Sequence, residues 1–75
     1  MIITEFKMDD GDQFKFITSP YPMLKSVYVA VYKNRQIYEQ FGNSVYKDNE
    51  LNYHKKLRES LSKEEHVVEI GGSDI

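Results

Sequence analysis

The sequence contains no cysteine, no long apolar run and no marked excess of charge of either sign. A chain without cysteine forms no disulfide, no thiolate zinc site and no iron–sulfur cluster, and it has no cysteine nucleophile. No apolar segment approaches the roughly 20 residues that a membrane span needs, and residues 1–8 lack the basic start and apolar stretch of a signal peptide. We therefore expect a cytoplasmic protein, and the sequence indicates no membrane, metal, cofactor or small-molecule substrate.

The length and composition indicate one small globular domain. The chain has 75 residues, of which 40% are hydrophobic and 29% charged, and its net charge is −2. With apolar burial worth about 25 cal/mol per Å², a core this small barely offsets the entropy of folding, so a partner or a second copy would add stability. Frequent lysine, asparagine, tyrosine and isoleucine are typical of an AT-rich genome, such as that of a low-GC bacterium or its phage. We expect one domain over residues 1–75, with a flexible tail at 71–75.

Residues 1–19 have the pattern of a β-hairpin. Apolar and polar residues alternate on both sides of Asp9-Asp10-Gly11, as they do in half-buried strands. A three-residue loop places Gly11 where φ is positive, which glycine adopts without steric cost. The register set by this loop gives two chemically matched faces. The predicted pairs are Phe6–Phe14, Thr4–Phe16, Ile2–Thr18, Glu5–Lys15 and Ile3–Ile17.

Residues 24–41 are ambiguous between a second hairpin and a helix. The segment 26–32 is dominated by β-branched and aromatic residues, which favour a strand. A turn near Asn34-Arg35 then returns the chain over residues 36–41. We prefer this hairpin, with the proline-containing segment 19–22 as a connection at the end of the sheet. The alternative is a helix over 24–41 that ends at Gly42. The predicted cross-strand pairs are Tyr32–Ile37, Tyr28–Phe41 and Val31–Tyr38.

The rest of the chain predicts a helix followed by a short strand. Asp48 or Asn49 can cap a helix that runs to about Glu64, and its apolar arc packs on the sheet. Residues 66–70 have the pattern of a final strand before Gly71-Gly72. The apolar arc consists of Tyr53, Leu57 and Leu61. The predicted fold is α+β: a small single-domain antiparallel sheet of two hairpins with one helix packed on it and a short C-terminal strand, in the order ββββαβ.

No residue pattern indicates a catalytic or metal site. The acidic segment 9–12 lacks the ligand spacing of a calcium loop and is typical of a hairpin turn. Glu50 and His54 lie one helical turn apart, but two ligands do not make a zinc site, so we interpret them as a pair on the helix surface. His66 is interpreted as a strand-end residue. The serines lack the context of a nucleophile elbow, and no glycine-rich phosphate loop precedes a helix. We therefore expect that the protein is not an enzyme.

Basic residues gather in the middle of the chain. Residues 15–58 carry a net charge of +5, whereas the segments before and after them are acidic. On the predicted helix, several of these residues form a stripe opposite the apolar arc, which is either an ordinary solvated face or a phosphate-binding one. The basic residues that could contact nucleic acid are Lys25, Lys47, Lys55 and Arg58.

Tyrosine is the other conspicuous residue, with six copies in the chain. Both faces of the predicted hairpin over 26–41 are apolar, and one helix cannot cover both. Either the sheet curls so that both faces are internal, or the tyrosine-rich face is exposed and meets a partner. Tyrosine suits interfaces because its ring buries area while its hydroxyl keeps a hydrogen bond. The predicted partner-binding residues are Tyr28, Tyr32, Tyr38, Lys33 and Arg35.

Two functions agree with these features. The first is a small non-enzymatic protein–protein interaction or regulatory module, homodimeric or docked on another protein, and encoded by a phage or mobile element. The alternative is a single-stranded nucleic-acid-binding protein in which Tyr28 and Tyr32 stack on bases while Lys and Arg neutralise phosphates. The isoelectric point near 5.6 argues against a polyanion as the ligand, because nucleic-acid-binding domains are usually basic.

Overall fold

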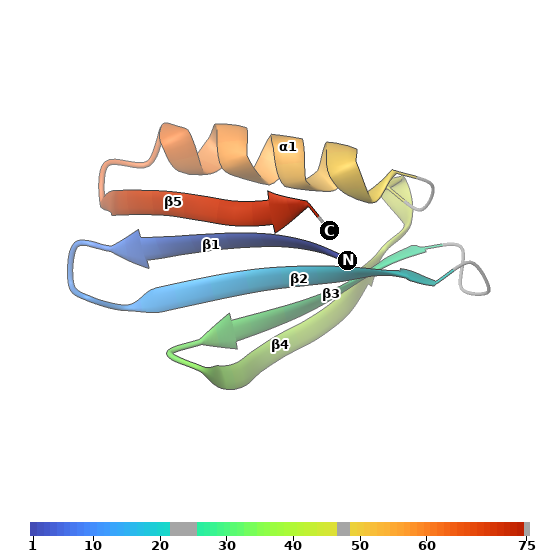
Figure 1. Ribbon diagram of the computed structural model, residues 1–75, viewed down its shortest axis with the longest axis horizontal. Helices are drawn as coiled ribbons and strands as arrows, with labels where there is room; N and C mark the ends of the chain where they lie inside the picture. Colours follow the sequence, from blue (N-terminus) through green and yellow to red (C-terminus); the bar gives the residue numbers. More distant parts are fainter. Residues whose placement is uncertain (22–25, 47–48, 75) are drawn as a thin grey trace.

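Five antiparallel strands and one α-helix form the structure, a computed structural model that describes residues 1–21, 26–46 and 49–74. The strand order across the sheet is β4-β3-β2-β1-β5, and α1 lies along one face, above β5 and β1 (Figure 1). The predicted α+β fold and its ββββαβ order are confirmed. The elements are β1 (Ile2–Met8), β2 (Gln13–Tyr21), β3 (Ser26–Lys33), β4 (Gln36–Asn43), the short 3-10 helix η1 (Ser44–Tyr46), α1 (Glu50–Ser62) and β5 (Val67–Asp74).

The β1–β2 hairpin has the predicted loop and register. Gly11 has a φ of 96°, and the Met8 N–H donates to the Asp12 carbonyl at 2.8 Å, which closes the three-residue loop. All five predicted pairs are present, from Ile2 opposite Thr18 to Phe6 opposite Phe14. Because side chains alternate between faces, this register decides which residues of β1 and β2 meet the helix.

Residues 26–43 form a hairpin and not the alternative helix, but its register differs from the prediction. Asn34 and Arg35 have φ values of 50° and 72°, as a two-residue hairpin turn requires. Tyr32 faces Ile37 as predicted, and a β-bulge then lies between Val31 and Tyr32. A bulge adds one residue to one strand, so every later pair shifts by one.

The shift changes which side chains of β4 reach the core. Tyr28 faces Gly42 and Val31 faces Glu39, so the predicted pairs Tyr28–Phe41 and Val31–Tyr38 are wrong. Phe41 instead lies opposite Val29 and packs against the core on the side of the sheet that carries α1. The bulge therefore recruits Phe41 to the core, which the unshifted register would have left on the opposite face.

Two strands extend further than predicted. β2 continues through Pro20, opposite Val27. Proline is tolerated there because β1 pairs with β2 only as far as Thr18, so β2 is an edge on that side. β5 continues through Asp74, where the sequence had predicted a tail from residue 71, because Gly71 and Gly72 pair with β1.

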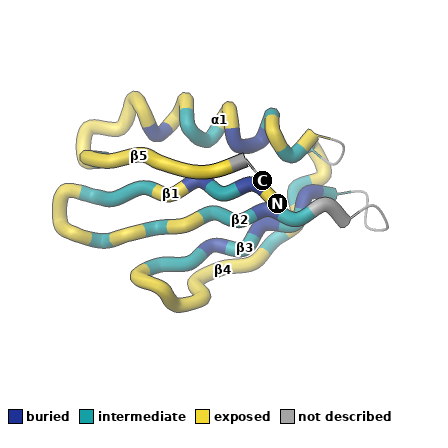
Figure 2. Tube along the Cα trace, in the orientation of Figure 1, coloured by how far each residue is buried: buried dark blue, intermediate teal, exposed yellow. Residues whose placement is uncertain are grey.

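The core lies between α1 and the three central strands. Val27, Val29 and Val31 are almost fully buried, and Tyr53 of α1 packs against them. Figure 2 shows buried residues on β1, β2, β3 and the inner side of α1, whereas β4 and β5 are mainly exposed. The helix begins where predicted, since Asn49 Oδ1 accepts a hydrogen bond from the Asn52 N–H at 2.9 Å. Further core contacts come from Phe14, Phe16, Phe41, Tyr46 and Leu57.

Candidate functional site

The predicted partner-binding residues border one edge of the sheet but do not share a face. Tyr28 and Tyr32 pair with Ser19 and Lys15 and lie on the face opposite α1, which we call the open face. The Tyr28 hydroxyl donates to Gln40 Oε1 at 2.5 Å. The other predicted residues lie elsewhere on the hairpin: Tyr38 and Lys33 are on the helix side, and Arg35 is in the turn.

On the helix side, Lys33 and Tyr38 form a small cluster with Phe14. Lys33 Nζ lies 5.7 Å from the ring centroids of both Phe14 and Tyr38, a distance at which a cation is attracted to an aromatic face. The two rings meet edge to face, with centroids 6.4 Å apart, and Lys33 also pairs with Asp12 at 3.8 Å. Tyr38 is nevertheless 62% exposed, so much of its ring remains available for contact.

β4 is an open edge of the sheet. Among the described strands, only β3 pairs with it, and its eight residues include no lysine or proline. Natural edge strands usually carry such residues because unpaired backbone groups attract other strands. Ile37 is 58% exposed beside the equally open Tyr38. Ile37 was not predicted as a site residue. Its predicted pairing with Tyr32, which was predicted as a partner-binding residue, could have identified it.

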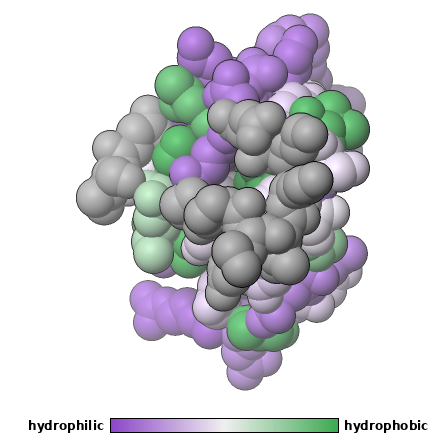
Figure 3. Space-filling model, turned by 90° about the vertical axis from the view of Figure 1, so that its right-hand side faces the viewer, coloured by the Kyte–Doolittle hydropathy of each residue, from purple (hydrophilic) through white to green (hydrophobic). Residues whose placement is uncertain are grey.

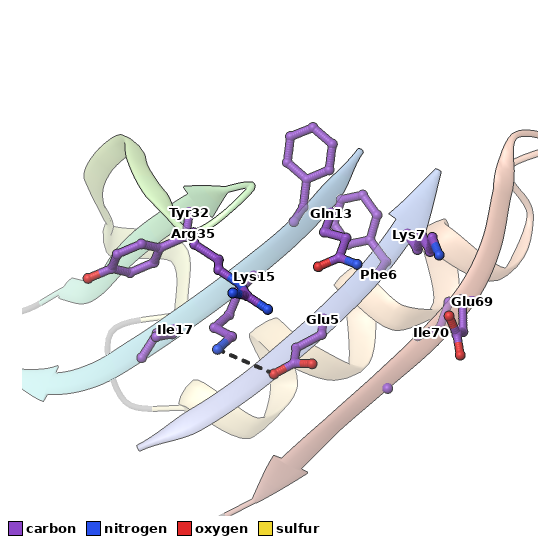
Figure 4. Close-up of a pocket in the computed structure, with 12 residues that line it drawn as sticks. Glu5, Phe6, Lys7, Gln13, Lys15, Ile17, Tyr32, Arg35, Glu69 and Ile70 are labelled. Atoms are coloured by element: carbon purple, nitrogen blue, oxygen red, sulfur yellow. Dashed lines mark ion pairs between the residues drawn. The ribbon is translucent and has the colours of Figure 1, made fainter. Parts of the chain in front are cut away.

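The open face carries a shallow trough of about 630 Å³ between β3, β2, β1 and β5 (Figure 4). Glu5 and Lys15 form an ion pair across it at 3.6 Å, and Arg35 extends from the β3–β4 turn on the same side. Among the described residues, Lys7 and Arg35 have no acidic group within ion-pair distance. The trough is lined by Tyr32, Ile17, Gln13 and charged residues of both signs: Glu5, Lys7, Lys15, Arg35 and Glu69.

The predicted basic stripe of the helix is only partly present. Lys25 and Lys47 lie outside the described residues, and Lys55 is exposed. Arg58 instead points toward the sheet: its Nε donates to Thr4 Oγ1 and its Nη2 to the Ile3 carbonyl, both at 2.9 Å. It reaches these acceptors because Gly72 has no side chain to block it. The outer surface of α1, at the top of Figure 3, is mainly hydrophilic.

The prediction that Glu50 and His54 form a pair on the helix surface is also wrong. His54 is fully buried between α1 and the sheet, where Nδ1 lies 2.6 Å from Thr4 Oγ1 and Nε2 lies 2.9 Å from Thr18 Oγ1. The Thr18 hydroxyl also donates to Glu50 Oε2 at 2.5 Å. With Arg58, these groups form what we call the buried polar cluster: Thr4, Thr18, Glu50, His54 and Arg58. His54 has no exposed surface, so its hydrogen bonds to the two threonines lie inside the fold.

His66 ties the β1–β2 loop to the start of β5. Its Nδ1 lies 2.7 Å from Asp9 Oδ2, and its carbonyl accepts from the Asp9 N–H at 2.8 Å. The hydrogen bond to Asp9, reinforced by the charge of the same carboxylate, raises the pKa of His66 above its usual 6.5. The imidazole is therefore more readily protonated than in a free chain.

Comparisons with known proteins give no relative from which a function could be transferred. No protein-family model matches the sequence, and neither a curated protein nor a solved structure matches it significantly. In the described part of the chain, no helix is long and apolar enough to cross a membrane. Nor do three His, Cys, Asp or Glu side chains among these residues gather where a metal ion could bind.

Proposed function

We propose that this protein is a small non-enzymatic protein–protein interaction module that binds its partner along β4. The observation that carries the proposal is the open β4 edge, with Ile37 and Tyr38 both exposed. A strand added to such an edge gains backbone hydrogen bonds, and its alternating side chains contact both faces of the sheet. This mode of binding explains how Tyr32 on the open face and Lys33 on the helix side can serve one interface.

The partner we propose is a second copy of this chain, with the two β4 strands antiparallel about a two-fold axis. Most homo-oligomers are dimers in which the same patch meets itself. Glu39 is the only charged residue in β4, and a register centred on Gln40 places it opposite Phe41 of the second copy. The two Glu39 carboxylates therefore do not face each other. Like charges directly opposite each other would destabilise the pairing of the two β4 strands. The dimer would also join two small cores into one continuous sheet.

The test is sedimentation equilibrium over a range of protein concentrations, with two matched variants. Ile37→Lys places a charge on the β4 edge, where lysine discourages strand pairing. Val68→Lys makes the same kind of change on β5, the other edge, at a residue that is 61% exposed against 58% for Ile37. Circular dichroism checks that both variants fold. We expect the wild-type protein and Val68→Lys to dimerise and Ile37→Lys to remain monomeric.

Three outcomes would contradict the proposed dimer. A wild-type protein that is monomeric at every concentration excludes a second copy as the partner. Dissociation by Val68→Lys but not by Ile37→Lys moves the interface to β5. Equal association of all three proteins shows that neither edge is involved.

One observation favours single-stranded nucleic acid as a second candidate ligand, bound on the open face. Lys7 and Arg35 line the same trough as Tyr32, and a tyrosine flanked by free cations can stack on a base while the cations contact phosphates. Glu5 and Glu69 line the trough too, which weakens attraction for a polyanion. Fluorescence anisotropy with a labelled oligonucleotide tests this candidate. Binding that Tyr32→Ala and Arg35→Ala both weaken supports it, and no binding at low salt excludes it.

A further inference from the structure

The hydrogen bonds of the buried polar cluster have only one consistent direction. A hydroxyl has a single proton to donate. An ionised Glu50 and the Ile2 carbonyl can only accept, at 2.5 and 3.5 Å from Thr18 Oγ1, so the Thr18 proton goes to one of them and Thr18 accepts the proton of His54 Nε2 at 2.9 Å. His54 Nδ1 is then the acceptor for the Thr4 hydroxyl at 2.6 Å, while Thr4 Oγ1 accepts from Arg58 Nε at 2.9 Å. The chain of donors runs from Arg58 through Thr4, His54 and Thr18 to Glu50, and it requires a neutral His54 with its proton on Nε2.

A proton added to His54 interrupts this chain. Nδ1 would become a donor to Thr4 Oγ1, whose two lone pairs can accept from both Nδ1 and Arg58, but the Thr4 hydroxyl would lose the acceptor of its own proton. The hydroxyl cannot turn to solvent instead, because Thr4, Thr18 and His54 are all fully buried. A buried polar group without a partner destabilises the folded state.

Two described side chains of opposite charge are linked to His54 through the threonines. Glu50 of α1 accepts from Thr18, and its negative charge would attract a protonated His54. Arg58 of α1 donates to Thr4, and its positive charge would repel a protonated His54. The Tyr53 ring packs edge to face against the imidazole, with centroids 5.6 Å apart. The described side chains that hydrogen-bond to it from β1 and β2 are the two threonines, which carry no charge. Among the described groups, the change that protonation makes is the loss of the hydrogen bond from the Thr4 hydroxyl to Nδ1.

We propose that His54 is a proton-sensitive latch that holds α1 on the sheet while neutral and weakens this contact when protonated. An imidazole in an unfolded chain takes up a proton near pH 6.5. If the folded protein keeps His54 neutral, the unfolded state binds one more proton below that pH, and the stability of the fold decreases as pH falls. Each pH unit below about 6.5 then lowers the folding equilibrium constant up to tenfold, until the folded protein is itself protonated.

The test measures the pH dependence of urea unfolding in two variants that differ only at residue 54. Both carry His66→Asn, because His66 titrates in the same range with the opposite sign. One retains His54 and the other has His54→Gln, whose amide can accept from one threonine and donate to the other but takes up no proton. We expect the folding constant of the first to fall about tenfold relative to the second between about pH 6.5 and 5. Parallel pH profiles would overturn the proposal.

A second measurement needs no variant at position 54 and applies even if His54→Gln does not fold. Long-range proton–nitrogen NMR spectra of the imidazole distinguish the two neutral tautomers and the charged form. At neutral pH we expect the pattern of a neutral ring with its proton on Nε2. A proton on Nδ1, in either the other tautomer or the imidazolium, would show that the direction of the chain is wrong and would overturn the latch.

Discussion

Substitution of Gly72 by alanine is the sharpest test of how α1 and β5 are joined to β1. A Cβ at this position would lie 2.3 Å from the Ile3 carbonyl oxygen and 2.8 Å from Arg58 Nη2, whereas real Cβ contacts essentially never fall below 3.0 Å. The closer obstacle is backbone and cannot rotate away. β5 must therefore move away from β1, and the Arg58 guanidinium, which donates a hydrogen bond to the Ile3 carbonyl at 2.9 Å, must shift as well.

The expected loss follows from these two contacts. Forcing extra volume into a packed site costs about 1–3 kcal/mol, and loss of a hydrogen bond from a charged donor costs about 1.5–3 kcal/mol. We therefore expect Gly72→Ala to lose about 3 kcal/mol, against a total stability of about 4–11 kcal/mol for a domain of this length. The melting temperature should fall by about 12–24 °C, because each kcal/mol corresponds to about 4–8 °C in small domains.

Gly71→Ala is the matched control, one residue away in the same strand. A Cβ there meets nothing within 4 Å, and alanine restricts the unfolded chain, so this variant should gain up to about 1 kcal/mol. Thermal unfolding followed by circular dichroism compares the two. If Gly72→Ala melted within about 4 °C of Gly71→Ala, the close approach of β5, Arg58 and β1 would not be the constraint that we infer.

Three further predictions concern the loops and the helix end. Asp9→Asn removes the main cause of the raised pKa of His66, so NMR titration should show that pKa falling toward 6.5. In the wild type the pair stabilises the fold below pH 6.5, and this stabilisation disappears as pH rises through the folded-state pKa; an unchanged titration would contradict the pairing. Asn49→Ala loses the N-cap bond to Asn52 and should cost about 1 kcal/mol in urea unfolding, whereas no change would show that the cap is dispensable. Gly11→Ala places alanine at a φ of 96° and should cost about 1–2 kcal/mol, so equal stability would contradict the strained turn.

The sequence predicted the β1–β2 hairpin completely because two signals agreed there. Alternating side chains and the position of Gly11 both specify one register, and a slip by one residue would exchange the faces. In the β3–β4 hairpin, the sequence indicated the turn but gave no indication of the bulge. Nothing in the local sequence distinguishes Tyr38 as the extra residue, because the bulge brings Phe41 against the core, a contact with distant parts of the chain.

The buried polar cluster was missed because polarity alone places a residue on the surface. Glu50, His54 and Arg58 recur every four residues on α1, but their polarity led us to interpret Glu50 and His54 as a surface pair and Arg58 as part of the basic stripe. The overlooked signal was in the strands: Thr4 and Thr18 occupy inward positions of a correctly predicted register. Hydroxyls at buried positions need partners, and the polar helix residues are the groups that provide them. Two inward threonines therefore implied a polar face on the helix.

The pairing of β1 with β5 has a consequence for how the chain folds. Ile3 lies opposite Ser73, so one side of β1 is completed only by the last strand of the sheet. The two hairpins close over short loops and can form within about 1–10 μs, whereas contacts between distant segments form slowly. During synthesis on a ribosome, β1 would keep an unpaired side until α1 and β5 had emerged. The docking of α1 and β5 is thus the step expected to limit the folding rate.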